Sequence, residues 1–93
     1  MNQKKIRLAI LKELSDGNKT VKSEDLGIDD NTFMDVLDFL KEENLINGYE
    51  YFMDESFGFD KTRLTLKGEE YLSENSLLMK TYKGLKEIRS WLP

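Results

Sequence analysis

The sequence lacks histidine and cysteine, and each absence excludes a class of chemistry. Without histidine there is no Ser-His-Asp or Cys-His nucleophilic pair, and the commonest side-chain ligand of transition metals is missing. Without cysteine there can be no disulfide and no cysteine-based zinc site. The phosphate-binding patterns GxGxxG and GxxxxGK followed by Ser or Thr do not occur either. We therefore expect no enzyme activity, no catalytic, cofactor-binding or metal-binding residues, and no small-molecule substrate.

Proline and long apolar runs are also scarce. The one proline is residue 93, and no apolar run approaches the roughly 20 residues that a membrane-spanning helix needs. The basic start is followed by only four apolar residues before Lys12 and Glu13, which does not resemble a signal peptide. We expect residues 1–93 to form a single cytoplasmic domain that does not enter a membrane.

Charge is plentiful and unevenly distributed. The net charge is −4. Residues 1–22 carry six basic and two acidic side chains, residues 23–60 carry one basic and twelve acidic, and residues 61–93 carry seven basic and four acidic. Two basic ends therefore flank an acidic middle.

Hydrophobic periodicity predicts three helices in the first half. Residues 3–15 place four apolar side chains on one face, Ser23 is an N-cap candidate for a short helix at 24–26, and Asp29 or Asp30 caps a helix at about 30–44. The inward stripe of this third helix is Phe33, Val36, Leu37 and Leu40.

In the second half of the sequence the hydrophobic pattern is no longer that of a helix. Asn47-Gly48 is a turn signal, residues 49–53 are typical of a strand, and residues 62–65 form the return strand. Thr65 is placed to cap a helix at 66–75, and Ser76 to cap a last helix at about 77–91. Residues 76–93 would then form a C-terminal helical extension, packed on the domain or at a dimer interface.

The resulting order, ααα-ββ-αα, predicts a mainly α protein with a small β-hairpin, a winged helix-turn-helix. Several segments resemble the YjcQ family of small proteins from Gram-positive bacteria and their phages: residues 9–14, 25–28, 39–42, 64–72 and the tail at 82–92 that contains Trp91. The resemblance implies a winged-helix fold and a prophage setting. It supplies no activity and no site residues.

The charge of the third helix argues against the usual way in which this fold meets DNA. In a helix-turn-helix the second helix of the pair enters the major groove. At helical spacing Asp35, Asp38 and Glu42 lie opposite the apolar stripe, and residues 29–44 contain six acids and one base. A groove lined by phosphates repels such a face. It is either a solvated surface or an acidic docking face for a basic protein partner.

DNA could instead meet other basic residues. They lie near the N-terminus, in the wing and in the tail: Lys4, Lys5, Lys61, Arg63, Lys80, Lys83, Lys86 and Arg89. The alternative is that these side chains are the solvated face of packed helices.

The last predicted helix is apolar over about half of its circumference. It either closes over the core of its own chain or pairs with a second chain in a homodimer, for which Trp91 is the anchor candidate. The functional prediction is a small non-catalytic regulatory module that binds nucleic acid. The alternative is a protein-interaction module that has lost DNA binding.

Overall fold

The computed structural model of the chain describes residues 3–48, 50–51, 57–58 and 62–92. The protein is mainly helical, with short antiparallel strands between the third and fourth helices. In chain order the elements are α1 (Gln3–Ser15), α2 (Ser23–Leu26), α3 (Asp30–Glu42), β1 (Ile46–Asn47), β2 (Glu50–Tyr51), β3 (Phe57–Gly58), β4 (Arg63–Leu64), α4 (Leu66–Glu74), α5 (Ser76–Met79), the 3-10 helix η1 (Leu85–Glu87) and α6 (Ile88–Trp91).

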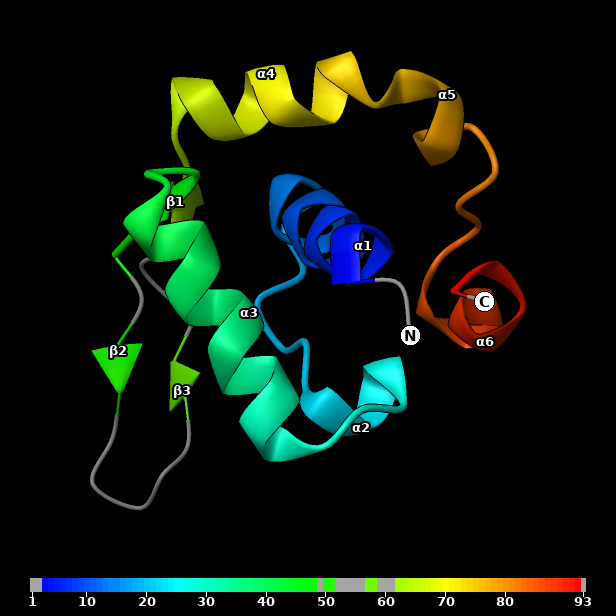
Figure 1. The fold of residues 1–93 in the computed structure, drawn as a ribbon, viewed down its shortest axis with the longest axis horizontal. Helices are drawn as coiled ribbons and strands as arrows, with labels where there is room; N and C mark the ends of the chain where they lie inside the picture. Colours follow the sequence, from blue (N-terminus) through cyan, green and yellow to red (C-terminus); the bar gives the residue numbers. More distant parts are fainter. Residues whose placement is uncertain (1–2, 49, 52–56, 59–61, 93) are drawn as a thin grey trace.

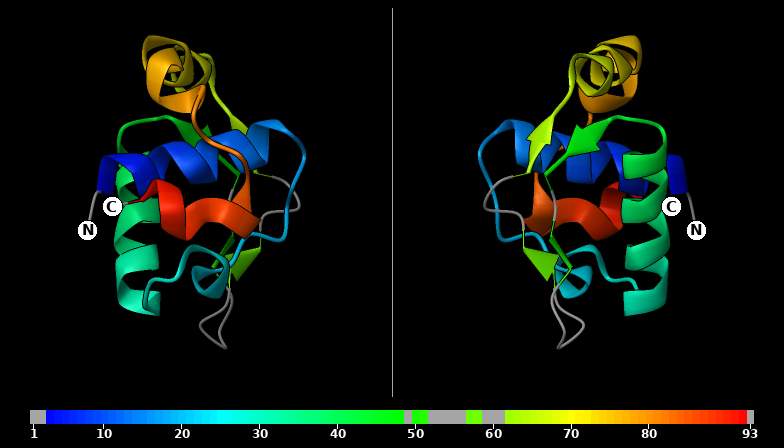
Figure 2. Two further views of the ribbon diagram at one scale, coloured as in Figure 1. Left: turned by 90° about the vertical axis from the view of Figure 1, so that its right-hand side faces the viewer. Right: turned by 90° about the vertical axis from the view of Figure 1, so that its left-hand side faces the viewer.

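Helix α1 runs through the middle of the molecule (Figure 1). Helix α3 lies on one side of it and α6 on the other, while α4 and α5 cross one end of the fold (Figure 2). Because several elements cover α1, its burial extends beyond the single predicted stripe: Leu8 and Ala9 are as fully buried as Ile6 and Ile10. This helix therefore organises the hydrophobic core.

Helix α3 confirms the predicted cap and inward stripe. The Thr32 N–H donates to Asp29 Oδ1 at 2.6 Å. This hydrogen bond to the ionised carboxylate lowers the pKa of Asp29. The four stripe residues are buried. The helix ends at Glu42, two residues before the expected end, and Asn44 takes a left-handed conformation at φ 58°.

Helix α2 differs from the prediction at its first residue. Ser23 lies inside the helix and its hydroxyl donates to Asp30 Oδ1 at 2.6 Å, so it is not the N-cap. The N-cap is Lys22, whose N–H donates to Asp25 Oδ2 at 3.0 Å. Gly27, at φ 69°, ends the helix in the left-handed conformation that glycine adopts most readily.

The hairpin starts earlier than predicted. β1 pairs with β4, Ile46 lying opposite Leu64, and β2 pairs with β3, Tyr51 lying opposite Phe57. Asn47, predicted as part of a turn that precedes the first strand, is itself a residue of β1. Two residues separate β1 from β2, whereas four separate β3 from β4, so the two ladders are not in one continuous register. Much of the expected wing, including residues 52–56 and 59–61, lies outside the described residues.

Helix α4 is fixed to the end of α3 by the predicted cap. Thr65 Oγ1 accepts a hydrogen bond from the Gly68 N–H at 3.0 Å and donates one to the Asn44 carbonyl, while the Thr65 N–H donates to the Leu45 carbonyl at 3.1 Å. A Cβ atom at Gly68 would lie 2.1 Å from the same Leu45 oxygen. The start of α4 therefore lies directly against backbone, which only glycine permits.

The predicted continuous helix at 77–91 is wrong. α5 begins at Ser76 itself, with Asn75 as the cap residue, and ends at Met79. Gly84, at φ 102°, then sets the chain in a conformation outside the helical region, before η1 and α6 begin. The break allows the tail to fold back onto α1, so that Ile88, Trp91 and Leu92 join the core of their own chain.

The arrangement of the helices and the small hairpin is winged-helix-like, as the order ααα-ββ-αα predicts. Within the described part of the chain, no helix has the length and apolar character to span a bilayer.

Candidate functional site

Three lysines from the two ends of the chain meet around one cavity. Lys5 comes from α1, Lys80 follows α5, and Lys83 lies in the connection to η1. The cavity has a volume of about 510 Å³. Its lining is Lys5, Lys80, Thr81, Lys83, Glu87, Ser90 and Trp91.

Trp91 forms the inner wall of this cavity and is held by polar contacts. Only 6% of its surface is exposed. Its Nε1–H donates to Thr81 Oγ1 at 2.8 Å, and the Thr81 hydroxyl donates onward to the Leu78 carbonyl at 2.8 Å. Lys5 Nζ donates to the Trp91 carbonyl oxygen at 2.6 Å and lies 5.3 Å from the centre of the indole ring. The wall is thus tied both to α1 and to the chain after α5.

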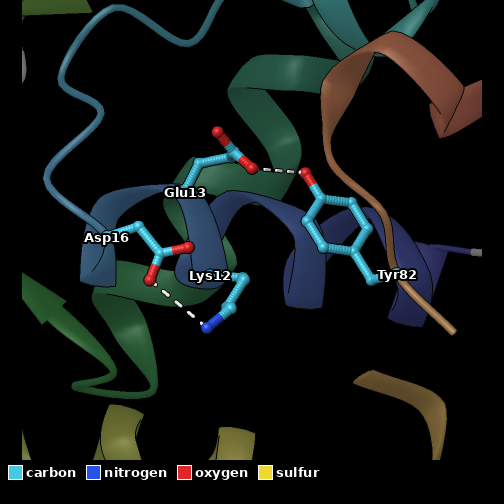
Figure 3. A network of polar contacts seen from close by, with 4 residues as sticks. All are labelled: Lys12, Glu13, Asp16 and Tyr82. Carbon is cyan, nitrogen blue, oxygen red and sulfur yellow. Dashed lines mark hydrogen bonds and ion pairs between the residues drawn. The ribbon is translucent and has the colours of Figure 1, made fainter. Parts of the chain in front are cut away.

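A second contact fastens the connection beside the cavity to α1 (Figure 3). The Tyr82 hydroxyl donates to Glu13 Oε2 at 2.6 Å, and its ring meets that of Trp91 edge to face, with 5.0 Å between centroids. Burial raises the pKa of Tyr82 well above its ordinary value, and the Glu13 carboxylate adds to this effect because it favours the neutral phenol. Nearby, Lys12 and Asp16 form an exposed ion pair at 3.2 Å.

The electrostatics of the lining favour an anion. Among the described residues that line the cavity, three are lysines and one, Glu87, carries a carboxylate. Lysine binds phosphate as a compact point charge with three donor hydrogens. A negatively charged group is therefore the kind of ligand that these lining residues favour.

The other predicted basic contacts do not line this cavity. Lys4 is exposed at the start of α1, while Lys86 and Arg89 are exposed on η1 and α6, Arg89 lying beside Gly27. Arg63 is exposed on the hairpin, and Lys61 lies outside the described residues. The predicted set is thus divided among the tail, the start of α1 and the wing.

The acidic residues of α3 form a separate surface. Asp35, Asp38 and Glu42 are all exposed, on the helix whose opposite side carries the buried stripe. Whether this face docks a basic protein stays a prediction. In the described residues, no three side chains of the acidic or metal-ligating types gather closely enough to hold a metal ion.

The sequence identified the lysines as candidate contacts, but it did not predict that three of them line one cavity. Lys5 and Lys80 are 75 positions apart, and no local pattern signals that they share a cavity with Thr81 and Ser90. The contact of Glu13 with Tyr82 was missed for the same reason. Trp91, predicted as a dimer anchor, packs against its own chain, and its role in a dimer stays a prediction.

Comparisons with known proteins agree on one family. The sequence model of the family described as "YjcQ protein" matches residues 4–91. The chain is 42% identical over 93 residues to "Uncharacterized protein YjcQ" from Bacillus subtilis (strain 168), covering 99% of each chain. No solved structure matches the chain. The match over nearly the whole length confirms the resemblance noted in the sequence, and the chain belongs to the YjcQ family.

Proposed function

We propose that this YjcQ family protein is a small, non-catalytic regulatory module of the cytoplasm that binds nucleic acid through the surface around Lys5, Lys80 and Lys83. The observation that carries the proposal is the convergence of these lysines, from the two ends of the chain, on one side of the molecule. Lysine side chains that neutralise phosphates supply most of the sequence-independent affinity for DNA. A prophage-associated role is part of the same proposal and rests on the family resemblance.

This surface differs from the one that helix-turn-helix proteins use. Helix α3 would meet the major groove in the usual arrangement, but it presents Asp35, Asp38 and Glu42. In the proposed complex α3 faces away from the duplex, because α6 and α3 lie on opposite sides of α1. The phosphate backbone, rather than base edges, is then the main contact, and we expect little sequence preference.

The test is binding of a mixed-sequence duplex, followed by fluorescence anisotropy at several salt concentrations. Affinity should fall steeply as salt rises, and Lys83→Glu with Lys86→Glu should abolish binding. The matched control is Lys41→Glu with Lys67→Glu, which makes the same charge change on α3 and α4 and should retain binding. No retention of the duplex by the native protein at low salt would disprove the proposal.

A second candidate function follows from the exposed acids of α3. As a protein-interaction module, the chain would dock a basic protein on Asp35 and Asp38. Capture of such a partner should be lost on Asp35→Lys with Asp38→Lys, and kept on Glu69→Lys with Glu70→Lys, which makes the same change on α4. Capture that survives the α3 substitutions would rule out this docking face.

A further inference from the structure

We propose that the C-terminal segment 85–92, which comprises η1, α6 and Leu92, exchanges between two copies of the chain to form a domain-swapped dimer. In the structure this segment packs on its own chain, where Ile88, Trp91 and Leu92 are buried in the core. In the dimer the same surfaces meet, but the segment comes from the other copy. The proposal concerns assembly and holds whether or not the protein binds nucleic acid.

Gly84 is the hinge of this exchange. It joins the non-helical residues 80–83 to η1, and its backbone lies at φ 102° and ψ 176°. This conformation is essentially confined to glycine, and any other residue held in it is strained. The closed monomer needs it, since at this point the chain turns back toward α1 (Figure 1). An opened chain is released from that requirement.

The local sequence opposes the closed hinge. Apolar residues from Leu77 to Leu92 recur at helical spacing, so the pattern alone predicts one helix over about 77–91. One straight helix would not reproduce the return of the chain that buries Trp91. Local preference and tertiary packing therefore disagree at the hinge, and an exchanged segment satisfies the packing without the closed conformation of Gly84.

The contacts that hold the segment join it to residues before the hinge, so a second copy can supply them equally well. Lys5 Nζ donates to the Trp91 carbonyl at 2.6 Å, and Trp91 Nε1–H donates to Thr81 Oγ1 at 2.8 Å. Opening without exchange would leave the indole and its apolar neighbours in water, which is unfavourable. The dimer restores these contacts, and Trp91 of each copy then forms the cavity wall of the other.

Protein concentration selects between the two forms. In the closed monomer the segment competes at an effective concentration of about millimolar, as expected for a short connection, so the native protein should be monomeric when dilute. Gly84→Ala should disfavour the closed conformation of each chain about tenfold or more. Because a swapped dimer relieves two hinges, its dissociation constant should fall about a hundredfold.

Sedimentation velocity over a range of protein concentrations tests the exchange. Gly84→Ala should dimerise at about a hundredfold lower concentration than the native protein, and the emission of Trp91 should not change because the indole stays buried. The matched control is Gly17→Ala, at φ 90° in the turn after α1. At either glycine a Cβ would meet no described heavy atom within 4 Å, so both substitutions strain the backbone alone, and Gly17→Ala should stay monomeric.

A longer hinge separates exchange from side-by-side dimerisation. Insertion of Gly-Gly-Ser after position 84 of the Gly84→Ala variant lets the segment turn back without strain and should restore the monomer. Three results would each overturn the proposal: a dimer that persists despite the insertion, equal dimerisation of the two glycine variants, or a folded Gly84→Ala variant that is monomeric at every concentration.

If Gly84→Ala does not fold, the native protein supplies a second test. Refolding from urea at about millimolar concentration should trap a fraction of dimer, because each segment then meets another chain about as often as its own. On dilution this dimer should return slowly to monomer, since it must open first. Refolding that yields monomer alone would refute the exchange.

Discussion

Gly68 and Thr65 together fix the place where α4 begins. The threonine hydroxyl bonds the Gly68 N–H and the Asn44 carbonyl, while the bare Cα of Gly68 lets the helix lie against the Leu45 carbonyl. The segment 65–68 is therefore more than a helix cap, because its glycine also allows α4 to pack closely against the backbone at Leu45. Each function needs its own residue type, which explains why Thr and Gly occur together at this spacing.

Gly68→Ala should destabilise the protein although alanine is the better helix former. Helix propensity alone would favour alanine by about 1 kcal/mol. The new Cβ, 2.1 Å from the Leu45 oxygen, forces α4 to shift, and overpacking of this kind typically costs about 1–3 kcal/mol. Urea denaturation should show a net loss, whereas Ser73→Ala on the exposed part of the same helix should be neutral or stabilising. An unchanged or higher midpoint for Gly68→Ala would contradict the close approach.

Tyr82→Phe should cost about 1.5 kcal/mol, because it removes a hydrogen bond to a charged carboxylate. Since folding raises the pKa of Tyr82, its contribution is complete below the unfolded value of about 10 and is lost as the pH rises above it. The free energy of unfolding of the native protein should therefore fall more between about pH 9 and pH 11 than that of Tyr82→Phe. Equal losses in the two proteins would show that Tyr82 does not titrate differently on unfolding.

Among the elements, the tail differs most from what its sequence predicts. Apolar residues at helical spacing predict one helix over 77–91, but the chain breaks at Gly84 and returns across α1. The break divides the predicted helix into short segments. α6 contributes fully buried residues to the core, whereas Leu78 and Met79 of α5 are only partly buried against it. α5 leaves Leu77 78% exposed.

Trp91→Ala tests whether the tail belongs to the fold. Removing a buried tryptophan side chain usually costs about 3–5 kcal/mol, which is a large part of the stability of a domain of this size. The loss should be the same at low and high protein concentration if Trp91 stabilises its own chain. Sedimentation of the native protein as a monomer at high concentration would further remove the homodimer prediction, whereas a loss of stability that depends on concentration would favour it.

The elements that sequence predicted well are those whose signals are local. The cap at Asp29, the stripe that begins at Phe33 and the cap at Thr65 each depend on residues within one or two turns of helix. The hairpin start and the tail depend on distant partners: Asn47 is a strand residue because Arg63 pairs with it. The candidate cavity belongs to the second class, since its lysines approach only after the tail has folded back onto α1.

At the scale of the whole molecule, two surfaces of opposite charge lie on different sides of α1. The acids of α3 lie on one flank of α1, and the lysine-lined cavity lies by α6 on the other. Charges on one flank are screened from a ligand on the other at physiological salt, where the Debye length is about 8 Å. The two surfaces can therefore act independently.

The double substitution Asp35→Asn with Asp38→Asn distinguishes DNA binding on the cavity side from DNA binding at α3. If the duplex binds at the cavity side, the affinity at physiological salt should change less than about twofold, because the substituted charges are screened. If the duplex instead meets α3, removal of two repelling charges should raise the affinity many-fold. Anisotropy at low and moderate salt measures both cases, and a large gain at moderate salt would move the nucleic-acid surface to α3.

The hydrogen bond between Lys5 and the Trp91 carbonyl also bears on how the molecule forms during translation. It joins positions 86 residues apart, so the central helix emerges from the ribosome long before its last covering segment exists. At about 5–20 residues per second, the interval is roughly 4–17 seconds. During that interval the apolar flank of α1 that α6 will cover stays open to water and to other nascent chains, so the unfinished polypeptide exposes apolar surface that the folded protein buries.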